Sequence, residues 1–371
     1  MDRPPPLPLA PDELPEEIRR FVDPSAPAPA RMMAARGLVP IKGNHQITML
    51  AQLSADADEM VAKTATDSLT KLPEPVLLPA CQAPLHPSVL DLLADKRKEN
   101  QKALELIVAN PKTADSTVEW ISRSAPELLC EQIAVNEQRL LKAPQIIEAL
   151  YKNRNTRMST ADRMVELAAR NGLELTGIPS FQAHVEAVRG QLIPEPSQEP
   201  LYGDSLFQEC LEDDRDDEAF EQDEVKGEEK VKEMYKPLAM RIKDMTTGEK
   251  IRLALVGSSV ARALLVRDRD RNVAMAVVCS PAISLKEIID IAKSRDISDD
   301  VLRYIGNRRE WLRSGKLKAA LVFNPRTPVG ISLKFLSHLR LDELKRLARS
   351  RNVAAQIRSV AAQWVSRREK I

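Results

Sequence analysis

The sequence predicts an all-α protein in which short helical repeats stack into an α-solenoid. Only 12 of the 371 residues are glycine and 4% are aromatic, which is low for a chain of strands and tight turns. Leu, Ala, Glu, Lys and Arg dominate, and these residues favour helix. Apolar residues recur at helical spacing through most of the chain, and one pattern repeats along it.

The first forty residues contain ten prolines. Each proline removes a backbone donor and fixes φ, so no continuous helix is expected to cross this stretch. We therefore predict that residues 1–40 form a proline-rich disordered tail, with one or two helical turns over 12–22. The tail is expected to be a spacer, or alternatively a proline-rich ligand for another domain.

The next predicted element is an N-terminal helical-repeat domain over residues 41–190. Ile47, Leu50 and Leu53 mark one short helix, and apolar residues at helical spacing mark a second one after an acidic start at 56–59. Acidic residues at the start of a helix suit its dipole.

Residues 191–234 hold sixteen acidic and four basic residues, a net charge of −12. Such a segment repels itself and has little apolar surface, so we predict an acidic linker that does not fold alone. Apolar and aromatic residues interrupt it, and they indicate either a docking motif for a groove or a plain tether. The residues of this linker docking motif are Tyr202, Leu206, Phe207, Leu211 and Phe220.

Residues 235–371 form the predicted basic C-terminal helical-repeat domain. Their net charge is +16, whereas residues 1–234 carry −15, so the near-neutral total of +1 hides a strongly dipolar chain. We hypothesise that the acidic linker folds back on this domain and competes with outside acidic partners, because the tether keeps its effective concentration high.

The repeat is centred on three prolines that each follow an apolar helix: Pro111, Pro281 and Pro325. The residue before each is Asn or Ser, which proline pushes out of the α region, so the first helix ends there. A second helix is expected to follow, and the pair buries its apolar faces by stacking on its neighbours. The valines three positions before the prolines are predicted to be buried; they are Val108, Val278 and Val322. A degenerate copy places Ile133, Asn136 and Ile147 in the matching positions.

Three stretches between 249 and 368 carry a family resemblance. They are the segments 249–255 (EKIRLAL), 307–311 (NRREW) and 320–328 (ALVFNPRTP). On these residues the chain resembles an uncharacterised bacterial helical-repeat family that is similar to HEAT and leucine-rich-repeat-variant solenoids, and residues 41–170 resemble it more weakly. The resemblance implies a fold and a scaffold-like role, and no catalytic residues. The family pattern favours Asn before the first proline, from which Ser280 departs.

The sequence favours neither a metal site nor a cofactor. Its four cysteines and four histidines are scattered, whereas structural zinc needs clustered ligands. The segment 268–272 resembles the start of an EF-hand loop, but Val273 and Cys279 stand where glycine and glutamate are required. Catalytic carboxylate pairs and Ser/His/Asp or Cys/His sets have no local support either, so we do not expect an enzyme.

Basic residues around one tryptophan form the predicted partner-binding site. Cations beside an aromatic ring are typical of nucleic-acid binding, through phosphate contacts and stacking. The alternative is that the tryptophan lies in the core, at helical spacing from Val301 and Tyr304, with arginines covering it. The site residues are Arg269, Arg271, Arg308, Arg309, Trp311, Arg313, Lys316 and Lys318.

These observations favour a non-enzymatic scaffold or adaptor that binds a protein or peptide partner, expected to be acidic, on a helical-repeat surface. The alternative is nucleic-acid or ribonucleoprotein binding through the basic C-terminal domain. No run of 18 uncharged apolar residues is present and the first residues lack the apolar stretch of a secretory signal. We therefore expect a cytoplasmic protein without a membrane partner.

Overall fold

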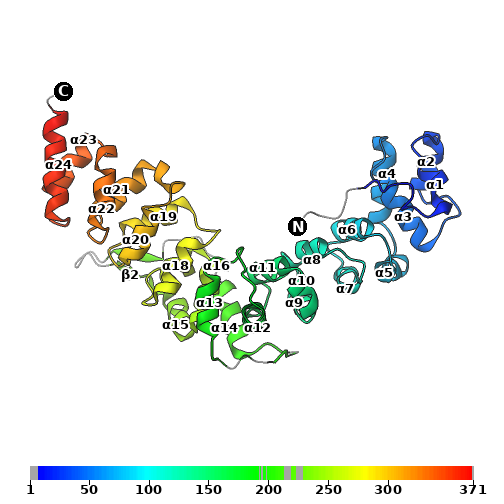
Figure 1. Cartoon of the computed structure of the whole chain (residues 1–371), viewed down its shortest axis with the longest axis horizontal. Helices are drawn as coiled ribbons and strands as arrows, with labels where there is room; N and C mark the ends of the chain where they lie inside the picture. The colour runs from blue at the N-terminus through cyan, green and yellow to red at the C-terminus, as the bar shows by residue number, and fades with distance from the viewer. Residues whose placement is uncertain are drawn as a thin grey trace. The chain divides into compact units, whose positions relative to one another are not determined.

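The computed structural model describes residues 7–191, 193, 195–197, 199–212, 219–222 and 229–369 (Figure 1). Within these residues the chain folds into 24 α-helices, with three short 3₁₀ helices and one small β-hairpin. The prediction of an all-α protein is confirmed. Contacts divide the chain into two compact units, Met1–Thr156 (unit 1) and Arg157–Ile371 (unit 2).

Unit 1 consists of eleven described helices. They are α1 (Glu16–Val22), α2 (Ala28–Ala35), α3 (Gly43–Leu53), α4 (Glu59–Thr70), α5 (Glu74–Gln82), α6 (Pro87–Lys96), α7 (Gln101–Ala109), α8 (Asp115–Ser122), α9 (Glu127–Ala134), α10 (Glu137–Lys142) and α11 (Pro144–Lys152).

Residues 7–40 contain two packed helices, whereas the sequence predicted a disordered tail here. Helices α1 and α2 pack on α3, and α2 also packs on α4. Leu14 and Ile18 are buried in this cluster. The prolines are compatible with helices here because Pro15 and Pro27 stand just before the first turns of α1 and α2, where no backbone donor is lost. Residues 1–6 of the predicted tail lie outside the described residues.

A buried asparagine connects the end of α7 to the end of α5 by hydrogen bonds. Asn110 ends α7, and its amide nitrogen donates to the carbonyl oxygens of Cys81 and Ala83, 2.8 Å from each, at the end of α5. The last carbonyls of a helix have no partner within the helix, so this side chain satisfies them. Its own oxygen accepts from the backbone N–H of Lys112, which shapes the turn after α7.

The same arrangement joins α11 to α8. Asn153 ends α11 and donates to the carbonyl oxygens of Ser122 and Ala125, 2.9 Å from each, at the end of α8. Asn136, which the sequence placed in the degenerate repeat, instead accepts from the backbone N–H of Arg139 and caps α10. The alignment on proline therefore missed Asn153, which no proline follows.

Unit 2 contains the remaining elements. They are α12 (Met158–Arg170), α13 (Phe181–Val188), α14 (Tyr202–Glu212), β1 (Phe220–Gln222), β2 (Glu229–Val231), η1 (Glu233–Tyr235), α15 (Lys236–Asp244), α16 (Thr247–Val256), α17 (Ser259–Leu265), α18 (Arg271–Cys279), α19 (Leu285–Lys293), α20 (Asp299–Ile305), η2 (Trp311–Arg313), α21 (Gly315–Phe323), α22 (Val329–Phe335), η3 (Leu336–His338), α23 (Leu341–Arg349) and α24 (Ala355–Arg368). Strands β1 and β2 pair antiparallel.

Helix ends in unit 2 are held in the same way. Asn324 ends α21 and donates to the carbonyl oxygens of Ala292 (2.8 Å) and Ser294 (2.7 Å) at the end of α19. Ser280 ends α18, and its hydroxyl donates to the carbonyl oxygen of Leu255, 3.2 Å away, at the end of α16. A serine has one donor where an asparagine has two. Ser280, which stands where the repeat pattern favours Asn, therefore makes one of the two hydrogen bonds that an asparagine makes.

The predicted turns are confirmed at all three prolines. Each one separates two helices, α7 from α8, α18 from α19 and α21 from α22. Val108, Val278 and Val322 are buried, and no strand lies at any of these places in the described residues.

The unit boundary differs from the predicted domain boundaries. Helices α12 and α13 belong to the predicted domain 41–190, yet α12 packs on α14, and α13 and α14 both pack on α16. The predicted linker 191–234 contributes α14, whose Phe207 and Leu211 are buried in the core of unit 2. The average composition obscured these apolar residues because half of the acidic residues of 191–234 are concentrated in the runs 213–218 and 223–228, which lie outside the described residues.

Candidate functional site

The predicted partner-binding residues fall into two groups along α18 and α20. Arg271 begins α18, two residues after Arg269, and its Nε lies 2.8 Å from a carboxylate oxygen of Asp300 at the start of α20. At the other ends of these helices, the Cys279 thiol lies 3.5 Å from the Tyr304 hydroxyl. The remaining six residues follow α20. The length of α18, about 12 Å at 1.5 Å per residue, separates the two groups.

The aromatic side of the second group is covered by arginine. Trp311 is half-buried and packs on the core of unit 2, with its ring centroid 6.2 Å from that of Tyr304 in an edge-to-face contact. The guanidinium carbon of Arg308 lies 5.1 Å and 6.0 Å from these two centroids, and Arg308 Nε donates to the Tyr304 hydroxyl at 3.0 Å. This geometry matches the alternative in which Trp311 belongs to the core. Arg308 covers ring surface that a nucleic-acid base would need.

The Tyr304 phenol serves as a hydrogen-bond partner. Burial raises the pKa of Tyr304, the adjacent Cys279 thiol raises it further, and Arg308 acts in the opposite direction. A raised pKa keeps the phenol neutral at physiological pH. As a neutral phenol it accepts the hydrogen bond from Arg308 Nε.

Four further cations of this group project from the same segment. Arg309, Arg313 and Lys316 are exposed and Lys318 is half-buried. Within the described residues, none of these four makes an ion pair or a side-chain hydrogen bond. Glu310 is the one carboxylate between positions 306 and 318. We call these four residues the basic patch; their charges face water and are not used to stabilise the fold.

The predicted linker docking motif is divided between surface and core. Tyr202 is 82% exposed, whereas Phe207 and Leu211 are buried. The Phe207 ring lies 4.8 Å below the guanidinium carbon of Arg252, which is itself 0% exposed. Leu206 is half-buried beside them. The apolar residues therefore dock on unit 2 of their own chain.

Phe220, the last residue of this motif, anchors the β-hairpin. It is half-buried, and its ring centroid lies 3.6 Å from the guanidinium carbon of Arg267 at the end of α17. Cation–π contacts of this kind favour a fixed position. Competition between the acidic segment and outside partners stays a prediction.

Sequence reasoning missed a polar contact between α14 and α12. The carboxylate of Asp204 accepts from the backbone N–H of Ser159 at 2.8 Å and from its hydroxyl at 2.9 Å. A carboxylate at the start of a helix satisfies free N–H groups and suits the dipole. The two partners are 45 positions apart in the sequence, so no local pattern indicated their contact.

A buried histidine lies in the same region. His184 Nε2 on α13 lies 2.8 Å from Asp162 Oδ1 on α12, and His184 is 0% exposed. Because the Ser159 hydroxyl bonds to Asp204, Ser159, His184 and Asp162 do not form the hydrogen-bonded chain of a catalytic triad. No group of three or more His, Cys, Asp or Glu side chains in the described part of the chain could hold a metal ion.

Glu249 completes this region at the start of α16. It forms a capping box with Thr246, whose backbone N–H donates to the Glu249 carboxylate at 2.6 Å. Burial raises the pKa of Glu249, and the charges of Asp162 and Asp204 add to the increase. We call Ser159, Asp162, His184, Asp204 and Glu249 the polar centre. Its residues come from α12, α13, α14 and the start of α16, which indicates a structural role.

Comparison with protein-family models, curated proteins and solved structures gave no match. The resemblance to a helical-repeat family therefore stays a prediction. Among the described helices, none combines the length and the apolar character that crossing a membrane requires.

Proposed function

We propose that the protein is a cytoplasmic, non-enzymatic scaffold or adaptor, built as an α-solenoid of short HEAT-like repeats, that binds an acidic segment of a partner protein. The observation that carries the proposal is the basic patch, four cations on one short segment of unit 2 that make no ion pair with any residue the structure describes. They are Arg309, Arg313, Lys316 and Lys318.

The recurring helix-end contacts support a repeat scaffold. In both units a buried Asn or Ser reaches carbonyl oxygens that lie 25 to 32 residues earlier in the chain. Each contact ties the end of one helix to a helix two or three places earlier. Stacked repeats of this kind present extended surfaces that suit protein and peptide partners.

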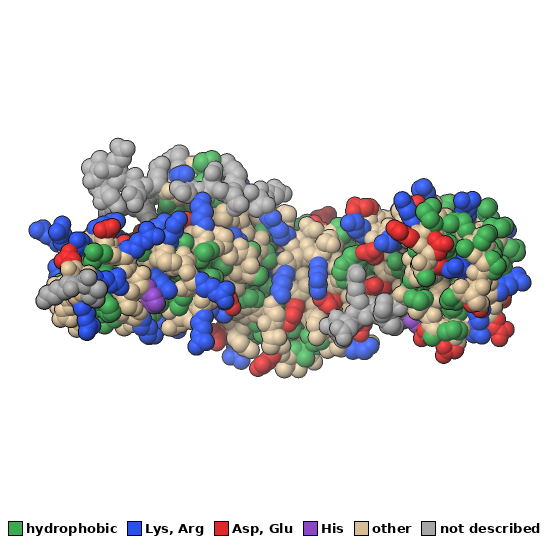
Figure 2. All heavy atoms as spheres, turned by 90° about the horizontal axis from the view of Figure 1, so that it is seen from above, with side chains coloured by type: hydrophobic (Ala, Val, Ile, Leu, Met, Phe, Trp, Pro, Cys, Tyr) green, Lys and Arg blue, Asp and Glu red, His purple; other side chains and the backbone are tan. Residues whose placement is uncertain are grey.

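The charge of unit 2 favours an acidic partner. Lys and Arg side chains predominate over Asp and Glu on the part of the visible face that holds the C-terminal helices (Figure 2). Several nearby carboxylates are already paired, among them Asp300 with Arg271 and Glu287 with Arg262. Positive surfaces of this kind steer acidic partners and set specificity.

Fluorescence anisotropy of a labelled acidic peptide with the full chain tests the proposal. Replacing Arg309, Arg313 and Lys316 by Glu should weaken binding by about tenfold or more at low salt. A variant with the same charge change at Lys286, Lys334 and Arg367, which are also exposed, should change it by less than about threefold. Equal losses in both variants would show a general charge effect and overturn the basic patch as the site.

Nucleic-acid binding is the second candidate, favoured by the aromatic pair Tyr304 and Trp311 beside the basic patch. Because Arg308 covers these rings, such binding would depend mainly on phosphate contacts. The logarithm of the affinity for single-stranded RNA should then fall with the logarithm of salt, with a slope of about −0.7 per phosphate contact. RNA that binds more tightly than the acidic peptide, with loss of partner capture after nuclease treatment, would favour this candidate.

A further inference from the structure

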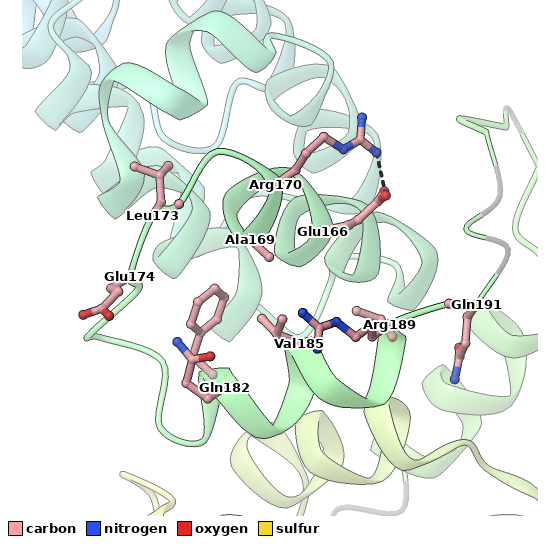
Figure 3. A pocket seen from close by; sticks show the side chains of 13 residues that line it. Glu166, Ala169, Arg170, Leu173, Glu174, Gln182, Val185, Arg189 and Gln191 are labelled. Atoms are coloured by element: carbon pink, nitrogen blue, oxygen red, sulfur yellow. Dashed lines mark hydrogen bonds and ion pairs between the residues drawn. The ribbon is translucent and has the colours of Figure 1, made fainter.

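A hollow of about 520 Å³ lies between the end of α12 and one face of α13 (Figure 3). All of its lining residues come from 166–191, so the hollow belongs to unit 2 alone. Its volume is within the range of pockets that bind small ligands. It is separate in sequence from the basic patch, and none of the residues of the polar centre lines it.

The floor of the hollow is apolar. Phe181 and Val188 on α13 are buried, and Val185 between them is half-buried. Ala169 and Leu173 add apolar surface from the end of α12. An apolar side chain placed here would remove its own surface and that of the floor from water. Each Å² of apolar surface buried in this way contributes about 25 cal/mol.

The end of α12 places Leu173 at the hollow through a glycine turn. Gly172 has φ +68°, and its N–H donates to the carbonyl oxygen of Ala169 at 3.1 Å, while Leu173 N–H donates to that of Ala168 at 2.9 Å. This pair of bonds is the Schellman motif, in which glycine is favoured because the backbone is left-handed. The sequence Asn171-Gly172-Leu173 therefore builds one wall.

Two exposed charged side chains stand at the hollow. Arg189 follows the end of α13 with its guanidinium directed over the floor toward Val185, whereas Glu174 lies on the opposite side beyond Gln182 (Figure 3). Both are exposed, and neither has an ion pair or side-chain hydrogen bond within the described residues.

The other two charged groups of the lining are already paired. Glu166 and Arg170 lie on one face of α12 and form an ion pair at 2.5 Å. The unpaired charges therefore give the hollow a positive end at Arg189 and a negative end at Glu174, with the apolar floor between them.

The dimensions fit an extended peptide. Gln182 and Arg189 are seven residues apart, a rise of about 10 Å along α13, and Glu174 lies beyond. In an extended peptide, residues i, i+2 and i+4 face the same side and span about 13 Å. An acidic residue at one end, an apolar residue in the middle and a basic residue at the other end would match Arg189, the floor and Glu174.

We propose that this hollow is a second peptide-binding site, which takes an extended partner segment with the pattern acidic–x–apolar–x–basic. The inference rests on the proposed adaptor function and names a class of segment that the adaptor binds. Main-chain groups of such a segment stay at the open side, so specificity comes from the three side chains.

Methyl NMR of the full chain tests the proposal, because Val185, Val188 and Leu173 report directly on the floor. The probe is a capped Ser-Glu-Ser-Leu-Ser-Lys-Ser peptide. It should shift these methyl signals in a saturable manner, and the same peptide with Ser in place of Leu should not. Absence of any saturable shift at about millimolar peptide, the weak end of peptide affinities, would overturn the proposal.

Charge exchange makes the test specific. R189E should weaken binding of the probe by about tenfold, and a probe with Lys in place of Glu should restore it. R367E, at an exposed arginine outside the hollow, is the matched control and should leave binding unchanged. Equal affinity of R189E and the native chain for the original probe would overturn the assigned role of Arg189.

The proposals for the basic patch and for the hollow can be tested independently of each other. Replacing Arg309, Arg313 and Lys316 by Glu should leave the methyl shifts intact, and R189E should leave binding of the acidic peptide intact. Loss of the methyl shifts in the triple variant would show that the hollow is not a separate site. Unchanged acidic-peptide binding in the triple variant, with the methyl shifts intact, would contradict only the basic patch.

Discussion

Single buried side chains hold helix ends together in both units. Asn324 satisfies two carbonyl oxygens of α19 that have no partner within their own helix. We expect Asn324→Ala to lower the free energy of unfolding of unit 2 by about 2–4 kcal/mol, because a buried polar group without a partner costs about 1–3 kcal/mol. Urea unfolding of the full chain, followed by circular dichroism, measures the change.

Asn324→Ser is the matched control, since the chain itself uses serine at position 280. It keeps one donor, so its loss should be clearly smaller than that of Asn324→Ala. Equal losses in the two variants would mean that packing, and not hydrogen bonding, explains the effect.

Glu249 makes the stability of unit 2 depend on pH. Its pKa in the folded chain is raised by burial and by Asp162 and Asp204 above the ordinary value of 4.5. The folded state therefore binds this proton more tightly than the unfolded state does. The resulting stabilisation is full below the ordinary pKa and is lost as pH rises through the raised value. Glu249→Gln keeps an acceptor for Thr246 but cannot titrate, so its stability relative to the native chain should improve between pH 4.5 and 7.

Glu287 provides the opposite case in the same unit. Burial acts to raise its pKa, but hydrogen bonds from Arg262 and Ser284 outweigh this and hold the pKa below its ordinary value. Its contribution is therefore present above pH 4.5 and is lost as pH falls through the lowered value. Glu287→Gln should destabilise the protein at pH 7, with a difference that shrinks in acid. Differences of the same sign in both variants would contradict these assignments.

At the scale of elements, α14 shows how a helix can be hidden in a charged segment. Phe207 and Leu211 lie on its buried side and Tyr202 on its exposed side. Phe207→Ala should cost about 3–5 kcal/mol of unfolding free energy, as expected for a buried aromatic residue. Tyr202→Ala on the same helix should stay within about 0.5 kcal/mol. If Phe207 were a free docking residue, its substitution would change partner binding without changing the denaturation midpoint.

The sequence was sufficient for helices and turns but not for contacts between them. Proline that follows Asn or Ser after an apolar run marks a helix end, which is why the turns at Pro111, Pro281 and Pro325 were predicted correctly. Asn153 also ends a helix, but no proline follows it, so the alignment on proline missed it. The spacing Asn-x-x-Thr, shared by 110–113, 153–156 and 324–327, is the signal that would have found it.

The candidate sites were predictable to different degrees. The basic patch follows from local sequence, because its cations lie within ten residues of one another and need no distant partner. The cover of Trp311 by Arg308 was anticipated only as an alternative, since burial depends on packing that a single segment does not reveal. The hollow depends on how the end of α12 faces α13, and nothing in residues 166–191 indicates that contact before the fold is known.

At the scale of the whole molecule, the position of the boundary between the units has a direct consequence. The fragment 157–371 contains α12, α13 and α14, which pack with α16 around Phe207 and Arg252. The fragment 235–371, which is the domain predicted from charge, lacks all three helices. It would expose the apolar surface of α16 and leave the fully buried Arg252 without its cover.

We therefore expect the fragment 157–371 to unfold in one cooperative transition, because it keeps the whole apolar core of unit 2. The fragment 235–371 should unfold at a lower denaturant midpoint and bind a dye that reports exposed apolar surface. Adding Phe207→Ala to the longer fragment should bring its midpoint toward that of the shorter one. Equal midpoints of the two fragments would show that α12–α14 contribute no stability, and that the acidic segment is a linker as its composition indicates.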